Sequence, residues 1–248
     1  MKVPMTRGKR LINYLNRNWL VLFSLSFGFY VGLPFLAPLL MHIGWEGPAK
    51  GIYLVYSFLC HQLPQRSFFL FGEKITYSLS EIQSTWVQTF DPFVLRQFIG
   101  NSDFGWKVAW SDRMVTMYTS ILLSAWIWRV FHSRIKKLPF WGLLLLILPL
   151  AIDGTTHFVS DFSGIGQGFR DSNVWLVELT NDAFTPMFYA GDALVSFNSW
   201  MRIVTGILFG LGIALFSMPI IKEFVDIAGR TSMIEMRKAE LRRKIIEK

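Results

Sequence analysis

The residues best suited to chemistry in this chain are polar groups beside long apolar stretches. Ionisable groups near a membrane are costly to bury, so they are usually paired with one another or functional. Six of them form one candidate site, either ligand-binding or structural: His61, Arg66, Arg113, Asp153, His157 and Arg170. The residues of any catalytic step stay unassigned.

Asp153 and His157 stand four residues apart and share one face if the helix before them continues. A carboxylate and an imidazole so placed could hold a metal, relay a proton or bond each other. Pairing is the commoner outcome, so we expect no metal, and His61, Asp153 and His157 are only weak candidate ligands. The lone cysteine, Cys60, is typical of a packed thiol.

The two arginines, Arg66 and Arg113, each need an acidic partner or an anionic ligand in a low-dielectric setting. The candidate internal partners are Asp112, Asp153 and Asp171. Two interpretations therefore stay open: Arg–Asp pairs that lock loops onto membrane helices, or a site for a small ligand.

Motifs of the common enzyme classes are absent from the sequence. It has no P-loop, no dinucleotide-binding glycine pattern, no His-Glu-x-x-His and no Gly-x-Ser-x-Gly. The sequence thus favours a non-enzymatic protein and leaves any cofactor unknown.

The elements that position these residues are membrane helices. Of 248 residues, 52% are hydrophobic and 17% are charged, against about 25% charged in soluble domains. A span needs about 20 apolar residues, and four stretches approach or exceed that length, at about 19–41, 114–131, 138–152 and 201–221. We predict an all-α, polytopic membrane protein with about four transmembrane helices and short interfacial or re-entrant helices.

The charges predict the orientation of these spans. Five basic and no acidic residues lie in segment 1–18, and eight basic against five acidic residues follow residue 221. The loop 42–113 is balanced and the loop 153–200 is acidic. By the positive-inside rule, both termini are cytoplasmic and both large loops lie outside the cell membrane. Basic residues beside a membrane attract anionic lipid, so the net charge of +8 needs no nucleic-acid partner.

Three shorter features complete the predicted organisation. Gly51 to Leu59 is apolar but too short to span, so it predicts an interfacial or re-entrant helix. Gly206 and Gly210 would allow a neighbouring helix to approach closely. The tail 222–248 predicts an amphipathic cytoplasmic helix, interrupted near Gly229, that lies on the membrane or docks on a partner.

The polar motifs resemble those of an uncharacterised family of prokaryotic membrane proteins, a domain of unknown function numbered 2085. The first motif, Cys60 to Phe69 (CHQLPQRSFF), is similar to the family's Cys-His-Gln-x-Pro-x-Arg-Ser-Phe. Four further segments agree in order with the family pattern: 111–118, 149–155, 170–173 and 201–206. The resemblance implies a membrane location and a common site for the motif residues, but no activity.

Departures from the family pattern bear on which metal or redox sites this chain could contain. Ser111 and Met114 replace two cysteines, so a cysteine-based metal or redox site is not expected here. His157 stands near the position of the family's glutamine. The segment 175–199 is inserted between two motifs.

Three functions remain open. The first is an accessory or structural subunit of a larger membrane complex, with membrane lipids and other membrane subunits as partners. The second is an ion-, metal- or small-molecule-binding membrane protein that uses the polar cluster. The third is a membrane-embedded enzyme acting on a lipid or envelope precursor. A ligand site would place the polar residues around an accessible cavity, whereas a structural cluster would pair them with one another.

Overall fold

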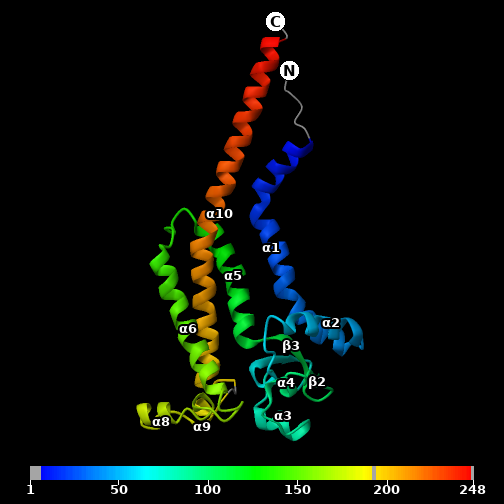
Figure 1. Cartoon of the computed structure of the whole chain (residues 1–248), viewed down its shortest axis with the longest axis vertical. Coiled ribbons are helices and arrows are strands. Elements are labelled where there is room, and N and C mark those ends of the chain that lie inside the picture. Colours follow the sequence, from blue (N-terminus) through cyan, green and yellow to red (C-terminus); the bar gives the residue numbers. More distant parts are fainter. Residues whose placement is uncertain (1–6, 192–193, 247–248) are drawn as a thin grey trace.

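A computed structural model of the chain describes residues 7–191 and 194–246 (Figure 1). Four of its helices are long and apolar enough to cross a bilayer: α1 (Arg7–His42), α5 (Asp112–Phe131), α6 (Phe140–Asp161) and α10 (Phe197–Ile246). These helices confirm the predicted class, a polytopic helical membrane protein.

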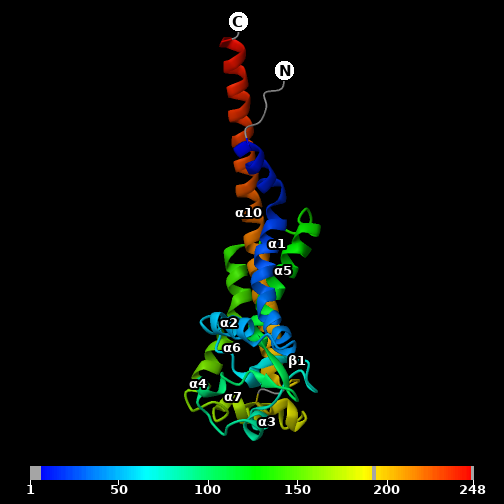
Figure 2. The ribbon, with the colours of Figure 1, turned by 90° about the vertical axis from the view of Figure 1, so that its right-hand side faces the viewer.

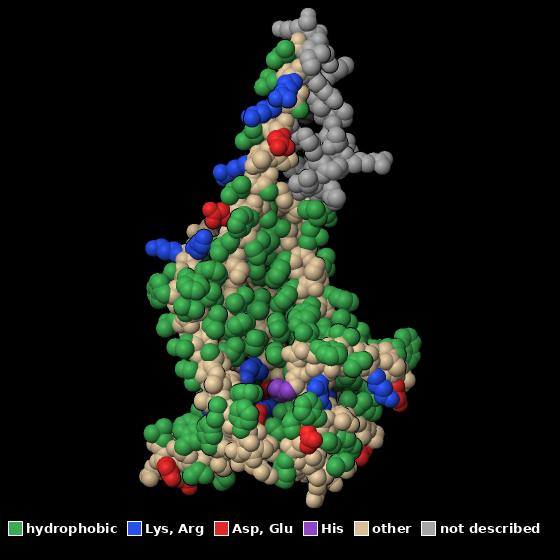
Figure 3. Space-filling model, viewed as in Figure 1, with side chains coloured by type: hydrophobic (Ala, Val, Ile, Leu, Met, Phe, Trp, Pro, Cys, Tyr) green, Lys and Arg blue, Asp and Glu red, His purple; other side chains and the backbone are tan. Residues whose placement is uncertain are grey.

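The long helices form a bundle around α10, which packs along α5 and α6 and also contacts α1. The described part of α1 begins at Arg7, and that of α10 ends at Ile246, beyond the bundle on the same side (Figures 1 and 2). Apolar side chains cover the surface of the bundle, as a lipid-facing surface requires (Figure 3).

Three of the helices are longer than the sequence predicted, and the first of them, α1, begins at Arg7 rather than near residue 19. Helix α6 continues past the expected end at residue 152 to Asp161, because the polar groups of its last two turns are buried against other elements. Helix α10 passes through Gly229 without a break. The interruption predicted there was wrong, since one glycine in a long helix costs only about 1 kcal/mol.

A small domain follows α1 at the end of the bundle opposite the termini (Figure 1). We call it the outer domain, residues 43–111. It contains α2 (Glu46–Ser57), the 3-10 turn η1 (Pro64–Arg66), α3 (Leu79–Thr85) and α4 (Pro92–Leu95). Strands β1 (Ser67–Leu70), β2 (Gly100–Asn101) and β3 (Gly105–Ser111) form an antiparallel sheet in the order β1-β3-β2. The sequence analysis did not predict this sheet.

Helix α2 lies across the bundle rather than along it (Figure 1). Its Tyr53 and Tyr56 are buried, whereas Leu54, Val55 and the following Phe58 are exposed. An exposed apolar edge on a short helix at the end of a membrane bundle is typical of an interfacial helix.

An aromatic cluster joins the outer domain to the bundle. The ring of Trp110 on β3 lies 5.1 Å from Tyr30 on α1, 5.3 Å from Tyr56 on α2 and 4.7 Å from Tyr118 on α5. Aromatic pairs at these spacings stabilise a core beyond their buried area. Strand β3 is thereby held against α1, and it leads directly into α5.

Short helices α7 (Phe169–Ser172), α8 (Val174–Thr180) and α9 (Pro186–Tyr189) connect α6 to α10. They lie beyond the outer end of α6 (Figure 1). The φ angles of Asn173 and Asn181 are 48° and 53°. Asparagine tolerates this left-handed conformation, and the two residues turn the chain before and after α8.

Helices α5 and α10 approach closely where the glycine pair predicted it. A Cβ atom on Gly210 would overlap Ser120 Oγ and lie 2.7 Å from the backbone nitrogen of Ile121. The Ser120 hydroxyl also donates to the carbonyl of Gly206 at 3.2 Å. The glycines therefore allow the two backbones to touch.

Candidate functional site

Asp153 is the centre of the polar cluster. Its carboxylate accepts from Arg113 Nη2 at 2.6 Å and from Arg170 Nη2 at 2.8 Å, one arginine on each oxygen. Asp153 and Arg170 are 5% and 6% exposed. Charged hydrogen bonds in such a buried setting are strong only if every group is paired, and here one carboxylate joins α5, α6 and α7.

The residues around Asp153 are arranged to admit these arginines. His157 lies one turn further on α6, with Nε2 3.8 Å from the Asp153 carboxylate and 3.3 Å from Arg170 Nη2. Gly154 leaves room for Arg113, because a Cβ atom there would lie 3.4 Å from Nη1. The predicted shared face of Asp153 and His157 is therefore confirmed, with an arginine between them.

Arg66 forms a separate bidentate pair. Its two terminal nitrogens each lie 2.8 Å from one oxygen of Asp161. Asp161 was not among the acidic partners named from the sequence. The signal that could have found it is spacing: Asp153, His157 and Asp161 follow one another at intervals of four residues, and share a face once α6 continues through them.

A fourth ion pair joins α10 to α5. Arg202 Nε donates to Asp112 at 2.7 Å, and both residues are buried. The other oxygen of Asp112 accepts from the backbone nitrogen of Arg113 at 2.7 Å. Asp112 is thus a partner predicted from the sequence, but it pairs with Arg202 rather than with Arg66 or Arg113.

The cluster also ties the backbone of α7 to α6 and α10. The backbone nitrogen of Arg170 donates to Ser160 Oγ at 3.0 Å. A Cβ atom on Gly168 would overlap Ser160, so glycine permits this approach. Arg170 also lies over the ring of Phe197, 5.3 Å from its centroid, and the Asn198 side chain donates to its carbonyl.

The first motif supplies two further candidates, Cys60 and His61. His61 is exposed, and its Nδ1 accepts from the backbone nitrogen of Leu63 at 3.0 Å. Cys60 is buried, with its sulfur 3.6 Å from Ser111 Oγ. Ser111 stands where the family pattern has a cysteine, so the first two motifs meet in space.

Two of the weak candidate metal ligands, Asp153 and His157, lie close together. Among residues 7–191 and 194–246, no three His, Cys, Asp or Glu side chains come together in a way that could hold a metal ion. His157 and Asp153 are joined by Arg170, a cation that occupies the place where a metal would compete.

A buried lysine was missed by the sequence analysis. Lys107 on β3 is fully buried, and its ammonium donates to the carbonyls of Gln62 at 2.9 Å and Arg96 at 2.6 Å. Burial lowers the pKa of Lys107 to about 7. Apolar and polar residues do not alternate regularly along β3. The sequence therefore does not show which of its side chains are buried, and the burial of Lys107 could not be predicted.

The polar cluster is therefore an ion-pair network. Arg66, Arg113, Arg170 and Arg202 all contact a carboxylate, and these four ion pairs connect η1, α5, α6, α7 and α10. Cavities of about 500, 550 and 310 Å³ have walls that contain none of the six predicted site residues.

Comparison with known proteins agrees with the membrane fold. The uncharacterized protein MJ1492 of Methanocaldococcus jannaschii is 26% identical over a 208-residue alignment that covers 79% of this chain and 88% of that protein. No solved structure matches the chain. Residues 102–216 match the family described as "Predicted membrane protein (DUF2085)". This region contains Arg113, Asp153, His157 and Arg170, and it begins after the Cys60–Phe69 motif. Over residues 102–216, the chain is therefore similar to the DUF2085 family of predicted membrane proteins.

Proposed function

We propose that the chain is a non-enzymatic accessory subunit of a larger membrane assembly. The observation that carries the proposal is the mutual pairing of the motif residues around Asp153. A site for an anionic ligand needs arginine donors directed into an open cavity, whereas each of these arginines already contacts a carboxylate. The network then acts as a scaffold that fixes the outer elements on the membrane helices.

The surface that this scaffold would present is formed by α8, α9 and the loop between them, residues 174–189. We call it the apolar ledge. Leu179 is 75% exposed and Met187 is 59% exposed, with Phe184 between them also exposed. Exposed apolar groups in one contiguous segment are typical of a protein interaction site.

Several contacts make the apolar ledge a defined shape rather than a loose loop. The Tyr189 hydroxyl lies 2.6 Å from Thr180 Oγ1 and accepts from the backbone nitrogen of Phe184 at 3.1 Å. Asn173 donates to the Tyr189 carbonyl at 2.9 Å. A fixed surface loses less entropy when it binds, which favours a docking role.

The charge of this region supports a protein partner over a lipid surface. Segment 174–189 exposes two acidic residues, Glu178 and Asp182, and contains no lysine or arginine. Acidic residues are repelled by anionic headgroups. We therefore expect the occupant of the apolar ledge to be the outer domain of another membrane subunit.

The same proposal includes orientation. The start of α1 at Arg7 and the end of α10 at Ile246 lie at one end of the bundle, and basic residues are concentrated in the sequence near both. Both features support cytoplasmic termini in the cell membrane and an external outer domain.

The test is affinity purification of the tagged full chain from its native membrane in mild detergent, followed by quantitative mass spectrometry. Three proteins are compared: the wild type, L179S/M187S on the apolar ledge, and F93S/I75S, a matched exposed apolar pair of the outer domain. We expect one membrane subunit at constant stoichiometry with the wild type and the matched pair, and its loss with L179S/M187S. A solitary wild-type chain, or equal recovery by all three, would overturn the proposal.

A further inference from the structure

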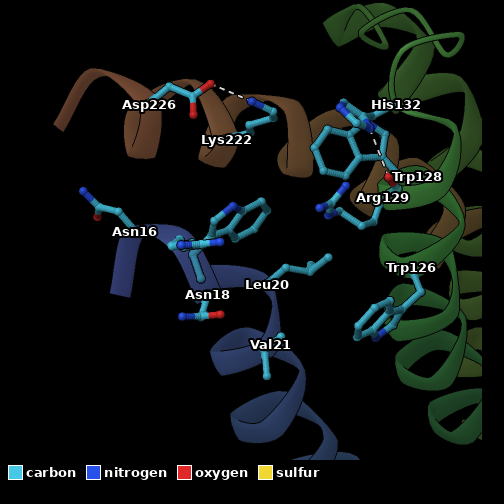
Figure 4. Close-up of a pocket in the computed structure, with 12 residues that line it drawn as sticks. Asn16, Asn18, Leu20, Val21, Trp126, Trp128, Arg129, His132, Lys222 and Asp226 are labelled. Carbon is cyan, nitrogen blue, oxygen red and sulfur yellow. Dashed lines mark hydrogen bonds and ion pairs between the residues drawn. The ribbon is translucent and has the colours of Figure 1, made fainter. Parts of the chain in front are cut away.

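A second polar region lies at the other end of the bundle, beside the termini. It surrounds a cavity of about 500 Å³ between α1, α5 and α10 (Figure 4). We call it the terminal cleft. Its walls are residues 16–21 of α1, Trp126, Trp128, Arg129 and His132 of α5, and Lys222 and Asp226 of α10.

The terminal cleft coincides with a break in α1. Asn18 has φ −113° and ψ 17°, outside helical geometry, and α1 changes direction there (Figure 1). The Asn18 side chain donates to the carbonyl of Tyr14 at 3.0 Å, which occupies a backbone group near the break. The change of direction separates the first part of α1 from α10, and a space remains between the two helices.

The terminal cleft carries an excess of positive charge, because Arg17, Arg129 and Lys222 line it with one acidic residue, Asp226. Lys222 is paired with Asp226 at 2.6 Å. In contrast, within residues 7–191 and 194–246, no carboxylate lies within ion-pair distance of Arg17 or Arg129. Arg129 points from α5 into the space between α1 and α10 (Figure 4). Two guanidinium groups facing one cavity suit a phosphate, which accepts their forked donors.

Aromatic residues place the terminal cleft at a membrane interface. Trp19, Trp126 and Trp128 all line it, and Trp126 is 45% exposed. Tryptophan is enriched where acyl chains meet headgroups. In Figure 3, the apolar surface of the bundle gives way at this end to scattered Lys and Arg side chains. A ligand here reaches the arginines from the bilayer side.

An adjoining cavity of about 550 Å³ extends the basic region. It shares Trp128, His132, Lys222 and Asp226 with the terminal cleft and adds Lys137 and Arg230. Glu223 partly offsets Lys137 at 3.8 Å. The additional cations strengthen attraction to an anionic group.

We propose that the terminal cleft binds the phosphate of an anionic phospholipid, held between Arg17 and Arg129. The glycerol and acyl chains would then run along Trp126 and Val21, which are both exposed beside the cleft. This inference is independent of the proposed subunit role, because it uses the opposite end of the bundle and none of the motif residues.

The test is native mass spectrometry of the full chain released from detergent that contains equal amounts of phosphatidylglycerol and phosphatidylcholine. Each basic residue near a membrane contributes about 1 kcal/mol of attraction, so a preference for phosphatidylglycerol of about tenfold or more is expected. R17Q/R129Q should remove that preference. The matched variant R134Q/K136Q, which removes two charges from the loop after α5 and outside both cavities, should retain it.

A competition arm separates a lipid from a soluble anion. If inorganic phosphate, added to about a hundredfold excess over lipid, leaves the lipid adduct in place, the headgroup assignment stands. Displacement of the adduct by inorganic phosphate overturns the lipid as the ligand. The site itself is overturned if the wild type retains both lipids equally. It is also overturned if the two double variants lose the preference for phosphatidylglycerol equally while their melting temperatures stay unchanged.

Discussion

Arg66 and Asp161 meet in a bidentate ion pair, with both nitrogen–oxygen distances at 2.8 Å, although 95 residues separate them in the chain. The pair joins the turn before β1 to the last turn of α6. It therefore holds the outer domain on the membrane bundle at a point that neither the aromatic cluster nor the chain connection reaches.

Breaking this pair should destabilise the protein. D161N leaves the guanidinium of Arg66, which is 5% exposed, without its carboxylate. Removing one partner of a buried pair costs about 3–5 kcal/mol, so we expect a clear fall in the midpoint of thermal unfolding in detergent. The matched control is E46Q, which breaks the exposed pair of Glu46 and Lys50 and should cost under about 1 kcal/mol. Equal melting temperatures for the two variants would contradict the account.

Arg170 should couple the network to the apolar ledge. It contacts Asp153 on α6 and the ring of Phe197 at the start of α10. R170K keeps the charge but loses the planar stack, so amide hydrogen exchange across residues 174–189 should accelerate. R113K is the matched control, because Arg113 contacts the same carboxylate from α5. Equal exchange in this segment for both variants would show that Arg170 has no such role.

Lys107 gives the outer domain a predictable dependence on pH. Burial lowers its pKa from 10.5 to about 7, so between these values the unfolded chain binds a proton that the folded chain lacks. The free energy of unfolding should therefore rise from pH 7 towards pH 10 and be lowest below pH 7. K107M should reduce that rise in thermal melts, whereas K74M, at an exposed lysine, should preserve it. A wild type whose stability falls between pH 7 and pH 9 relative to K107M would contradict the prediction.

Gly210 should be intolerant of any side chain. In G210A the new methyl group overlaps Ser120 on α5, which costs about 1–3 kcal/mol when helices cannot separate. Gly32 on α1 is the matched control, because a Cβ atom there would meet no other atom within 4 Å. G32A should be neutral or stabilising, since alanine favours a helix by about 1 kcal/mol. Thermal melts that rank the two variants in the opposite order would exclude close packing of α5 and α10.

The long helices could be predicted because a helix that spans a bilayer needs a long apolar run, and such runs can be read directly from the sequence. Asp153 and His157 could be grouped because helical spacing places them on one face. The pairing of Arg66 with Asp161 and of Asp112 with Arg202 could not be predicted, since it depends on which helices become neighbours. Lys107 escaped notice for a similar reason: its burial follows from the packing of α2 and the outer loops over a short sheet.

Native mass and metal analysis of the wild-type protein would test the central claim most directly, which is that the Asp153 network is a scaffold. The account predicts that lipid and the partner subunit are the only bound species, that no stoichiometric metal is present, and that H157Q retains the same bound species as the wild type. A metal or small molecule at one equivalent that disappears in H157Q, while the melting temperature stays unchanged, would contradict the scaffold and establish a ligand site.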